Sequence, residues 1–155
     1  MSLREAITGS PVETLDLTGY VRLDESCTVR EAIRLMKLYD HTTVLVTRDN
    51  TLCGIFTERD VLRKVAQDSC SWERPVSAYM APDPVTIRPA ETVEAAVRRM
   101  NKGHFRDLPV VDARGAILGN LTDNAIVRHL CDYLQVEVLN LPPTPGLVAQ
   151  LAEGA

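Results

Sequence analysis

The sequence lacks the features of several classes of protein. No apolar run approaches the roughly 20 residues that a membrane-spanning helix needs. The N-terminal stretch, with Arg4 and Glu5, has no apolar core of the kind that signal peptides contain. Basic residues are not in excess, because 17 Lys and Arg stand against 21 Asp and Glu, a formal net charge of −4. Nucleic-acid-binding proteins usually carry a basic surplus. We therefore expect a cytoplasmic protein that binds neither membrane nor nucleic acid.

Metal-binding, disulfide and catalytic patterns are also missing. The cysteines, Cys27, Cys53, Cys70 and Cys131, include no C-x-x-C pair, and no histidine cluster accompanies them. Four reduced thiols are ordinary in a cytosolic protein. The sequence contains no Gly-x-Ser-x-Gly, no P-loop, no His-x-x-x-His and no Glu-x-x-His, and its carboxylates are scattered. We expect no metal, no required cofactor and no enzymatic activity.

What the sequence does contain is an internal repeat. Residues 54–60 (GIFTERD) return as 119–125 (GNLTDNA), and residues 28–36 return as 92–100. The offset is 64 residues for the upstream pair (92 − 28) and 65 for the downstream pair (119 − 54), so one residue is inserted between them. A repeat of this length indicates two copies of one supersecondary unit, each too small to bury its apolar face alone. At 155 residues the chain suits one domain or a tight pair of half-domains.

Both halves predict the element order β-α-β-β-α. In the first half, Thr28 caps a helix whose residues Val29, Ala32, Ile33, Met36 and Tyr39 share one face. The remaining elements of this half are strands at 20–23, 43–47 and 52–56 and a helix from Thr57 to about residue 67. The second half repeats this order with strands at 85–87, 108–111 and 116–121, a helix lined by Val93, Ala96, Val97 and Met100, and a helix from Thr122 to about residue 133.

The chain divides into four parts. Residues 1–67 form the first unit with an N-terminal segment, 68–75 a connector, 76–134 the second unit and 135–155 a tail. Pro142, Pro143 and Pro145 exclude a regular helix in the tail. The apolar residues of the tail predict an extended segment that docks on another surface, and a frayed terminus is the alternative. These apolar residues are Val138, Leu139, Leu141, Leu147 and Val148.

Two constellations offer binding chemistry. Thr57-x-x-Asp60 opens a helix after a strand and a glycine, which favours either a simple capping box or a site for a polyol or an anion. A carboxylate such as Asp60 can accept hydrogen bonds from both hydroxyls of a ribose, but Ala125 replaces it in the second copy. Arg106, beside His104, could neutralise a phosphate; the alternative for each is an ordinary surface residue.

Together these residues resemble the cystathionine-β-synthase (CBS) domain family. Residues 54–60 resemble its G-h-x-T-x-x-D signature, in which h is hydrophobic. Residues 105–112 resemble its R-x-L-P-V-V-D strand, and residues 80–86 its M-x-x-x-P-V-T opening. The resemblance covers about residues 3–134. It implies an α+β fold in which two β-α-β-β-α motifs pack as a pseudo-two-fold CBS pair, also called a Bateman module. Such pairs usually dimerise into a flat disc and bind adenosyl compounds in the clefts between domains.

The resemblance also implies a binding site. Thr57 and Asp60 match the ribose-binding positions, Thr86 a polar position near the adenine, and Arg106 and His104 positions that face phosphates. Ala125 leaves the second copy with Thr122 alone, so we expect one good site per chain. The full set of expected ligand-binding residues is Gly54, Ile55, Thr57, Arg59, Asp60, Thr86, His104, Arg106 and Thr122.

The function implied is that of a standalone regulatory CBS pair that senses an adenosyl ligand. AMP, ADP and ATP come ahead of NAD and S-adenosylmethionine. Because the sequence shows no effector domain, we expect the output to act in trans on an unidentified protein target or through the tail. We expect a homodimer joined by an apolar face around Val61 and Val65 in one unit and Ile126 and Val127 in the other. The alternative is a structural dimerisation scaffold with vestigial sites.

Overall fold

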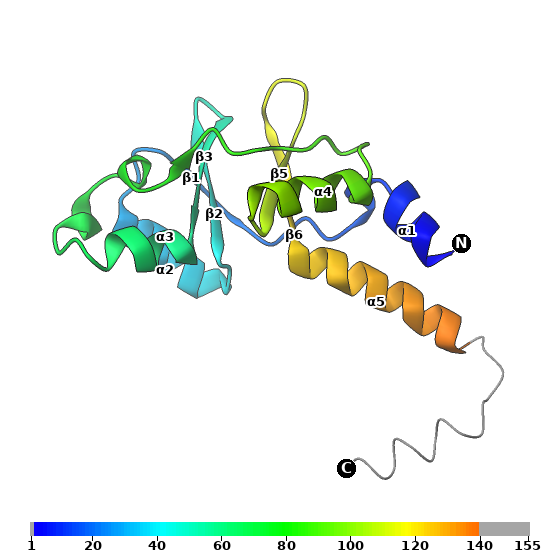
Figure 1. Cartoon of the computed structure of the whole chain (residues 1–155). Helices are drawn as coiled ribbons and strands as arrows, with labels where there is room; N and C mark the ends of the chain where they lie inside the picture. The colour runs from blue at the N-terminus through cyan, green and yellow to red at the C-terminus, as the bar shows by residue number, and fades with distance from the viewer. Residues whose placement is uncertain (1, 140–155) are drawn as a thin grey trace, which may run out of the picture.

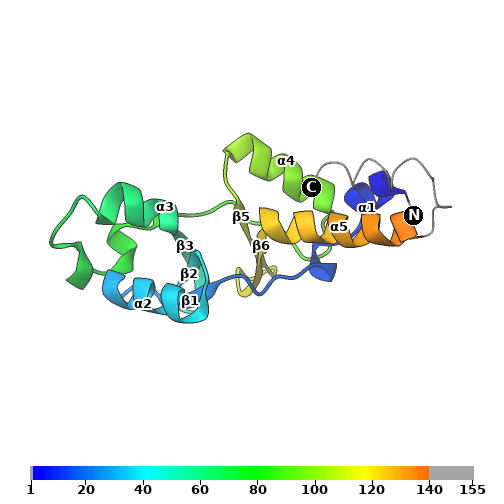
Figure 2. The same cartoon turned by 90° about the horizontal axis from the view of Figure 1, so that it is seen from below.

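Two units of mixed α and β structure lie side by side in the computed structural model, which describes residues 2–139 (Figures 1 and 2). The first unit contains a four-stranded sheet of order β1-β2-β3-β4. Its elements are β1 (Val21–Asp24), α2 (Val29–Tyr39), β2 (Thr43–Arg48), β3 (Thr51–Thr57), α3 (Glu58–Asp60), the π-helical turn η2 (Val61–Val65), the short turns η3 (Ser71–Glu73) and η4 (Val76–Ala78), and β4 (Ala81–Pro82).

The second unit is built on a two-stranded sheet. Its elements are α1 (Leu3–Gly9), η1 (Val12–Thr14), α4 (Val93–Gly103), β5 (Asp107–Val111), β6 (Ile117–Thr122) and α5 (Asp123–Leu139). The helices α1 and α4 contact each other, and α1 also contacts α5. The expected α+β class and the repeated arrangement of helix, hairpin and helix are confirmed.

The two hairpins repeat each other in detail. Strands β2 and β3 pair antiparallel with an irregularity between Val46 and Thr47, and β5 and β6 pair antiparallel with one between Val110 and Val111. These positions are 64 residues apart in the sequence (110 − 46), so the bulge itself is repeated. The inserted residue lies in the turn of the second hairpin, because Thr47 faces Leu52 whereas Val111 faces Ile117.

Several elements differ from the sequence-based expectation. The expected strand at 85–87 is reduced to one bridge between Ile87 and Val110. The helix after Thr57 passes into a π-helical turn, and α5 continues past residue 133 to Leu139. The helix α1 was not predicted, although Ser2 and Glu5 form a capping box at its N-terminus. The expectations for the tail beyond residue 139 lie outside the described residues.

Each unit completes its core with a segment from the other half of the sequence. Val12 and Leu15, which precede the first unit, are buried with Ile87 and Leu108 in the second core. Backbone hydrogen bonds fix this crossing, from Val12 N to the Glu91 carbonyl oxygen (2.8 Å) and back from Val93 N to Ser10 (3.0 Å). The N-terminal segment, expected to accompany the first unit, therefore packs on the second.

The segment that follows the connector makes the reciprocal exchange. Val76 and Tyr79 are buried in the first core, and β4 pairs with β3 through Ala81 and Ile55. Neither half of the chain can therefore bury its apolar side chains without the other, as the repeat predicts.

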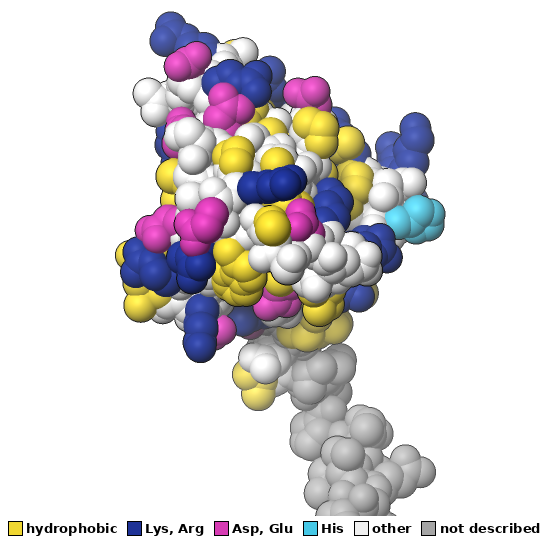
Figure 3. Space-filling view, turned by 90° about the vertical axis from the view of Figure 1, so that its left-hand side faces the viewer, with side chains coloured by type: hydrophobic (Ala, Val, Ile, Leu, Met, Phe, Trp, Pro, Cys, Tyr) yellow, Lys and Arg dark blue, Asp and Glu magenta, His cyan; other side chains and the backbone are white. Residues whose placement is uncertain are grey.

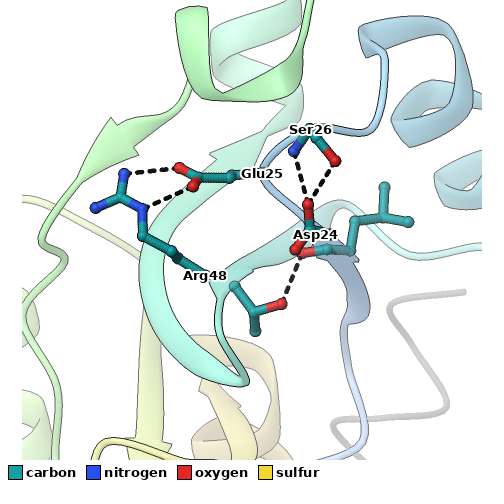
Figure 4. A network of polar contacts seen from close by, with 6 residues as sticks. Asp24, Glu25, Ser26 and Arg48 are labelled. Carbon is teal, nitrogen blue, oxygen red and sulfur yellow. Dashed lines mark hydrogen bonds and ion pairs between the residues drawn. The ribbon is translucent and has the colours of Figure 1, made fainter.

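An ion-pair and hydrogen-bond network closes the end of the first sheet (Figure 4). The guanidinium of Arg48 donates to both oxygens of Glu25, at 2.6 and 2.7 Å. This contact holds the pKa of the Glu25 carboxyl below its usual range. Asp24 accepts from the backbone N–H and the hydroxyl of Ser26, which fixes the turn between β1 and α2.

The prediction of an exposed apolar face for dimerisation was partly wrong. Val65 and Ile126 are buried in the two cores, and Val61 packs against the first core. Val127 is exposed as expected. The other large apolar side chains that reach solvent from helices and helical turns of the described residues are Leu3, Leu38, Tyr39, Leu62, Trp72, Leu134, Val136 and Leu139. Tyr39, expected on the inner face of its helix, is among them. Figure 3 shows the end of the first unit, where hydrophobic side chains lie among acidic and basic ones.

The exchanged N-terminal segment predicts an unequal effect of two identical substitutions. Val12→Ala removes two methyl groups from a fully buried position and should lower the free energy of unfolding by about 1–3 kcal/mol. Val85→Ala, at a half-exposed position, should change it by less than about 0.5 kcal/mol. Urea unfolding of both variants checks this, and equal effects would show that residues 10–15 do not belong to the second core.

Candidate functional site

A cavity of about 1050 Å³ opens between the two units. Both copies of the repeated motif face it, together with residues from the exchanged segments. The lining includes Asp16, Thr18, Gly19, Asp40, His41, Ile55, Thr57, Glu58, Arg59, Asp60, Asp83, Val85, Arg106, Asp107, Thr122, Asp123, Asn124, Ala125 and Arg128. Six of the nine expected site residues therefore line one cavity: Ile55, Thr57, Arg59, Asp60, Arg106 and Thr122.

Asp60 is the most constrained of these residues. Its Oδ2 accepts from the backbone N–H of Thr57 at 2.9 Å and from the Thr57 hydroxyl at 3.3 Å. Its Oδ1 lies 3.1 Å from Nζ of Lys64, which also donates to the Tyr79 carbonyl oxygen at 3.0 Å. The side chain is only 14% exposed. The capping interaction is thus present, and since an ionised carboxylate offers about four acceptor positions, it does not exhaust the oxygens of Asp60.

The second copy keeps the cap but lacks the carboxylate. The Thr122 hydroxyl accepts from the N–H of Ala125 at 3.0 Å. The N–H of Asn124 is taken by the carboxylate of Asp123 at 2.7 Å, and the N–H of Asp123 by the Arg106 carbonyl oxygen at 2.9 Å. From the sequence, unpaired N–H groups at a helix N-terminus were one possible anion site. In α5, however, the N–H groups of the first three residues already have hydrogen-bond partners within the chain.

Asp107 joins the two units at the cavity. Its Oδ1 accepts from the hydroxyl of Thr43 in β2 at 2.8 Å and from Nδ2 of Asn120 in β6 at 3.0 Å. Thr43 and Asn120 are fully buried. Asn120 Nδ2 also reaches the Gly19 carbonyl oxygen at 3.2 Å, while its Oδ1 is buried without a partner. This network links both hairpins to the segment that connects η1 with β1.

Arg106 extends from the neighbouring position into solvent. Its side chain is 77% exposed, and its Nε lies 3.9 Å from Oδ2 of Asp123. A contact at this distance between exposed groups is weak. Arg106 is therefore available to a bound anion at the rim of the cavity. Arg59 also lines the cavity, from α3.

Three expected site residues stand apart from the main cavity. Gly54 lies against Met80, and a Cβ at this position would overlap that side chain, so the glycine permits close packing of β3 and the segment before β4. His104 caps α4 in the left-handed conformation (φ 54°), with its N–H on the Met100 carbonyl oxygen. Thr86 lines an adjoining pocket of about 430 Å³ beside Arg88 and Arg114, which shares Asp83 and Pro84 with the main cavity.

Much of the cavity wall was not predicted from the sequence. Asp16, Thr18 and Gly19 reach it from the N-terminal segment, and Asp83 and Val85 from the segment after the connector. No local pattern marks these residues, because the exchange of segments between the units brings them to the site.

The described part of the chain shows neither a metal site nor a transmembrane segment. Within residues 2–139, no three His, Cys, Asp or Glu side chains gather so that they could hold a metal ion. No helix in this range is long and apolar enough to cross a membrane. The four cysteines are free, and burial raises the pKa of the Cys53 thiol.

The sequence is similar to those of known CBS domain proteins. The CBS domain model matches the chain twice, at residues 12–67 and 76–132. A CBS domain-containing protein of Arabidopsis thaliana, CBSCBSPB5, is 36% identical over 103 residues, or 65% of this chain and 19% of that protein. A homoserine O-acetyltransferase of Methanohalophilus mahii is 35% identical over 105 residues, or 67% of this chain and 21% of the enzyme. The chain thus spans about a fifth of the length of these relatives.

Solved structures share the fold over nearly their full length. CBSX2 in complex with AMP is 28% identical, with a TM-score of 0.70 over 83% of this chain and 99% of the other. A putative acetoin utilization protein of Vibrio cholerae, AcuB, is 25% identical, with a TM-score of 0.72 over 86% and 98%. The CBS domain pair of MJ0100, solved with 5′-methylthioadenosine and S-adenosyl-L-methionine, is 21% identical, with a TM-score of 0.69 over 77% and 98%, and supports the fold alone. The chain belongs to the CBS domain family, and residues 12–67 and 76–132 are its two CBS domains.

Proposed function

We propose that this CBS pair is a regulatory module that binds an adenosyl ligand in the cavity between its units. The observation that carries the proposal is the position of Thr57 and Asp60, which face a cavity of about 1050 Å³ walled by both CBS domains. Binding sites for small molecules usually measure about 300–1,000 Å³. The volume of this cavity is therefore sufficient for a ligand the size of a nucleotide. The related CBSX2, solved with AMP, supports an adenine nucleotide as the ligand.

The proposed contacts follow from the chemistry of the lining. Asp60 accepts one ribose hydroxyl at the acceptor position that the Thr57 N–H, the Thr57 hydroxyl and Lys64 leave open, and the other hydroxyl in place of the long 3.3 Å contact with the Thr57 hydroxyl. Ile55 offers an apolar wall for the base, and Arg106 and Arg59 meet a phosphate. Because the side chain of Ala125 cannot accept a hydrogen bond from a ribose hydroxyl, we propose one strong site per chain, with Thr122 as a minor contact. Gly54, Thr86 and His104 take no direct part in the proposed site.

Regulation would follow from the shared walls of the cavity. A ligand that touches both units binds most strongly to the relative arrangement that fits it, and it shifts the equilibrium by that difference in affinity. The changed shape would then be read by a protein partner. We propose this role rather than catalysis. The enzyme relatives do not oppose it, since the match to the acetyltransferase covers 21% of that enzyme.

We also propose that the chain forms a homodimer. Leu62 is 72% exposed, and Leu38 and Tyr39 from α2 are also exposed on the first unit. Val127 in α5 is exposed on the second unit. Exposed apolar side chains gathered on helices usually mark an interface.

Asp60→Ala should weaken adenosine and AMP binding by roughly 1.5–3 kcal/mol, the range for hydrogen bonds to a charged group. Asp60→Glu keeps the charge but displaces the carboxylate, so it should also bind weakly. Titration calorimetry on the full chain measures both effects.

Asp24→Ala is the matched control. Asp24 makes the same pair of hydrogen bonds, to the N–H and hydroxyl of one residue, outside the cavity. It should bind as the wild type does. Unchanged affinity in Asp60→Ala would reduce Asp60 to a helix cap and favour the alternative of a dimerisation scaffold with vestigial sites.

Arg106→Ala should weaken AMP binding and leave adenosine nearly unchanged, because the exposed guanidinium contacts only the phosphate. Higher salt should reduce the difference, since an exposed ion pair is screened. Calorimetry with both ligands tests this. An equal loss for AMP and adenosine would assign Arg106 to the fold instead of the phosphate.

Leu62→Glu should shift the chain toward the monomer, because a charge at the interface would have to be desolvated. Leu118→Glu, at a half-exposed position on the second hairpin, should leave the dimer intact. Sedimentation equilibrium at micromolar concentration distinguishes them. A monomeric wild type would refute the dimer.

A further inference from the structure

The cavity concentrates the negative charge of the chain. Its lining contains seven carboxylates, those of Asp16, Asp40, Glu58, Asp60, Asp83, Asp107 and Asp123. Against them stand three arginines, Arg59, Arg106 and Arg128. The lining thus has a formal charge of −4 with His41 neutral, which equals that of the whole chain. Once the lining is set aside from the totals of 21 and 17, the other residues balance at 14 acidic and 14 basic.

Within residues 2–139, one of the three arginines forms an ion pair with a carboxylate of the same lining, and that contact is weak. Arg106 lies beside Asp123, with 3.9 Å between Nε and Oδ2. The charge of Arg128 is among the influences that hold the pKa of Asp16 below its usual value, after the hydrogen bonds from Thr18. Neither Arg59 nor Arg128 forms an ion pair within residues 2–139. The three arginines are nevertheless outnumbered by the seven carboxylates of the lining, which limits the negative charge that a ligand can add.

The backbone adds little to this capacity. A helix N-terminus attracts anions through its unpaired N–H groups and its dipole. At the start of α5, Asp123 itself occupies this favourable position and accepts the N–H of Asn124. At the start of α3, the N–H of Glu58 is bound by the Thr42 carbonyl oxygen. Glu58 and Asp123 are equivalent residues of the repeat, so both motifs present a carboxylate where a phosphate would approach.

The described residues form no dedicated metal site that would offset this charge. Within residues 2–139, no three or more His, Cys, Asp or Glu side chains gather so that they could hold a metal ion. Each further phosphate of ADP or ATP therefore adds negative charge to a cavity whose lining is already negative, and like charges within one cavity repel each other.

We infer that the site selects adenosyl ligands with at most one phosphate and discriminates against ADP and ATP. This inference rests on the proposed function and narrows its ligand class. Adenosine derivatives with an uncharged or cationic 5′ group meet no repulsion, and a single phosphate is matched by Arg106. Asp60 recognises the ribose that all of these ligands share.

The test is calorimetric titration of the full chain with adenosine, AMP, ADP and ATP in a buffer that contains EDTA. ATP should bind roughly tenfold or more weakly than AMP, with ADP between them. Raising the salt concentration should narrow the ratio of AMP to ATP affinity, because screening weakens the repulsion. Equal or tighter binding of ATP would overturn the inference while leaving the proposed function intact. If adenosine and AMP also fail to bind, the proposed function falls and the inference falls with it.

A double variant links the discrimination to the carboxylates. Glu58→Gln with Asp123→Asn removes two lining charges and keeps side chains of the same size and an acceptor at each position. ATP should gain affinity relative to AMP by about threefold or more. Glu13→Gln removes an exposed carboxylate outside the cavity and should leave the ratio unchanged. An unchanged ratio in the double variant would contradict the role of these carboxylates.

Discussion

The hydrogen bonds of Asp107 fix how the two CBS domains meet. One carboxylate oxygen accepts from Thr43 in the first hairpin and from Asn120 in the second, and both donors are fully buried. A buried donor that loses its partner costs about 1–3 kcal/mol, so the network strongly favours one relative position of the hairpins. The exchange of segments strengthens the same constraint, since each core contains side chains from the other half of the chain. The cavity is a consequence of this packing, because residues from both domains and both exchanged segments form its walls.

The sequence repeat predicted those parts of the molecule that depend on local interactions. Thr28 and Thr122 cap their helices as expected, the hairpins follow the predicted strands, and Asp60 and Ala125 occupy equivalent positions around one cavity. The parts set by long-range packing were not predictable in this way. Asp16 and Asp83 reach the cavity only because their segments cross between units. The spacing of Val61 and Val65 correctly placed them together, but periodicity cannot say whether a shared face points inward, and both pack against the first core.

The difference between the two motifs gives the cavity its chemical character. The first motif supplies a carboxylate held by Thr57 and Lys64, with one of about four acceptor positions open. The second supplies Thr122 and a methyl group. In the proposed site the ribose therefore binds mainly to the first motif, while the surplus of carboxylates in the lining would limit how much negative charge the rest of the ligand carries. Charge placement and hydroxyl recognition thus act on different ends of the proposed ligand.

We propose that one ligand contacts both CBS domains within the shared cavity. Amide hydrogen exchange of the full chain, with and without saturating adenosine, tests this proposal. We expect slower exchange in residues 55–60 of the first domain and, in the same experiment, in residues 105–107 and 122–125 of the second. Slower exchange confined to one domain, or none near the cavity despite measured binding, would contradict the claim.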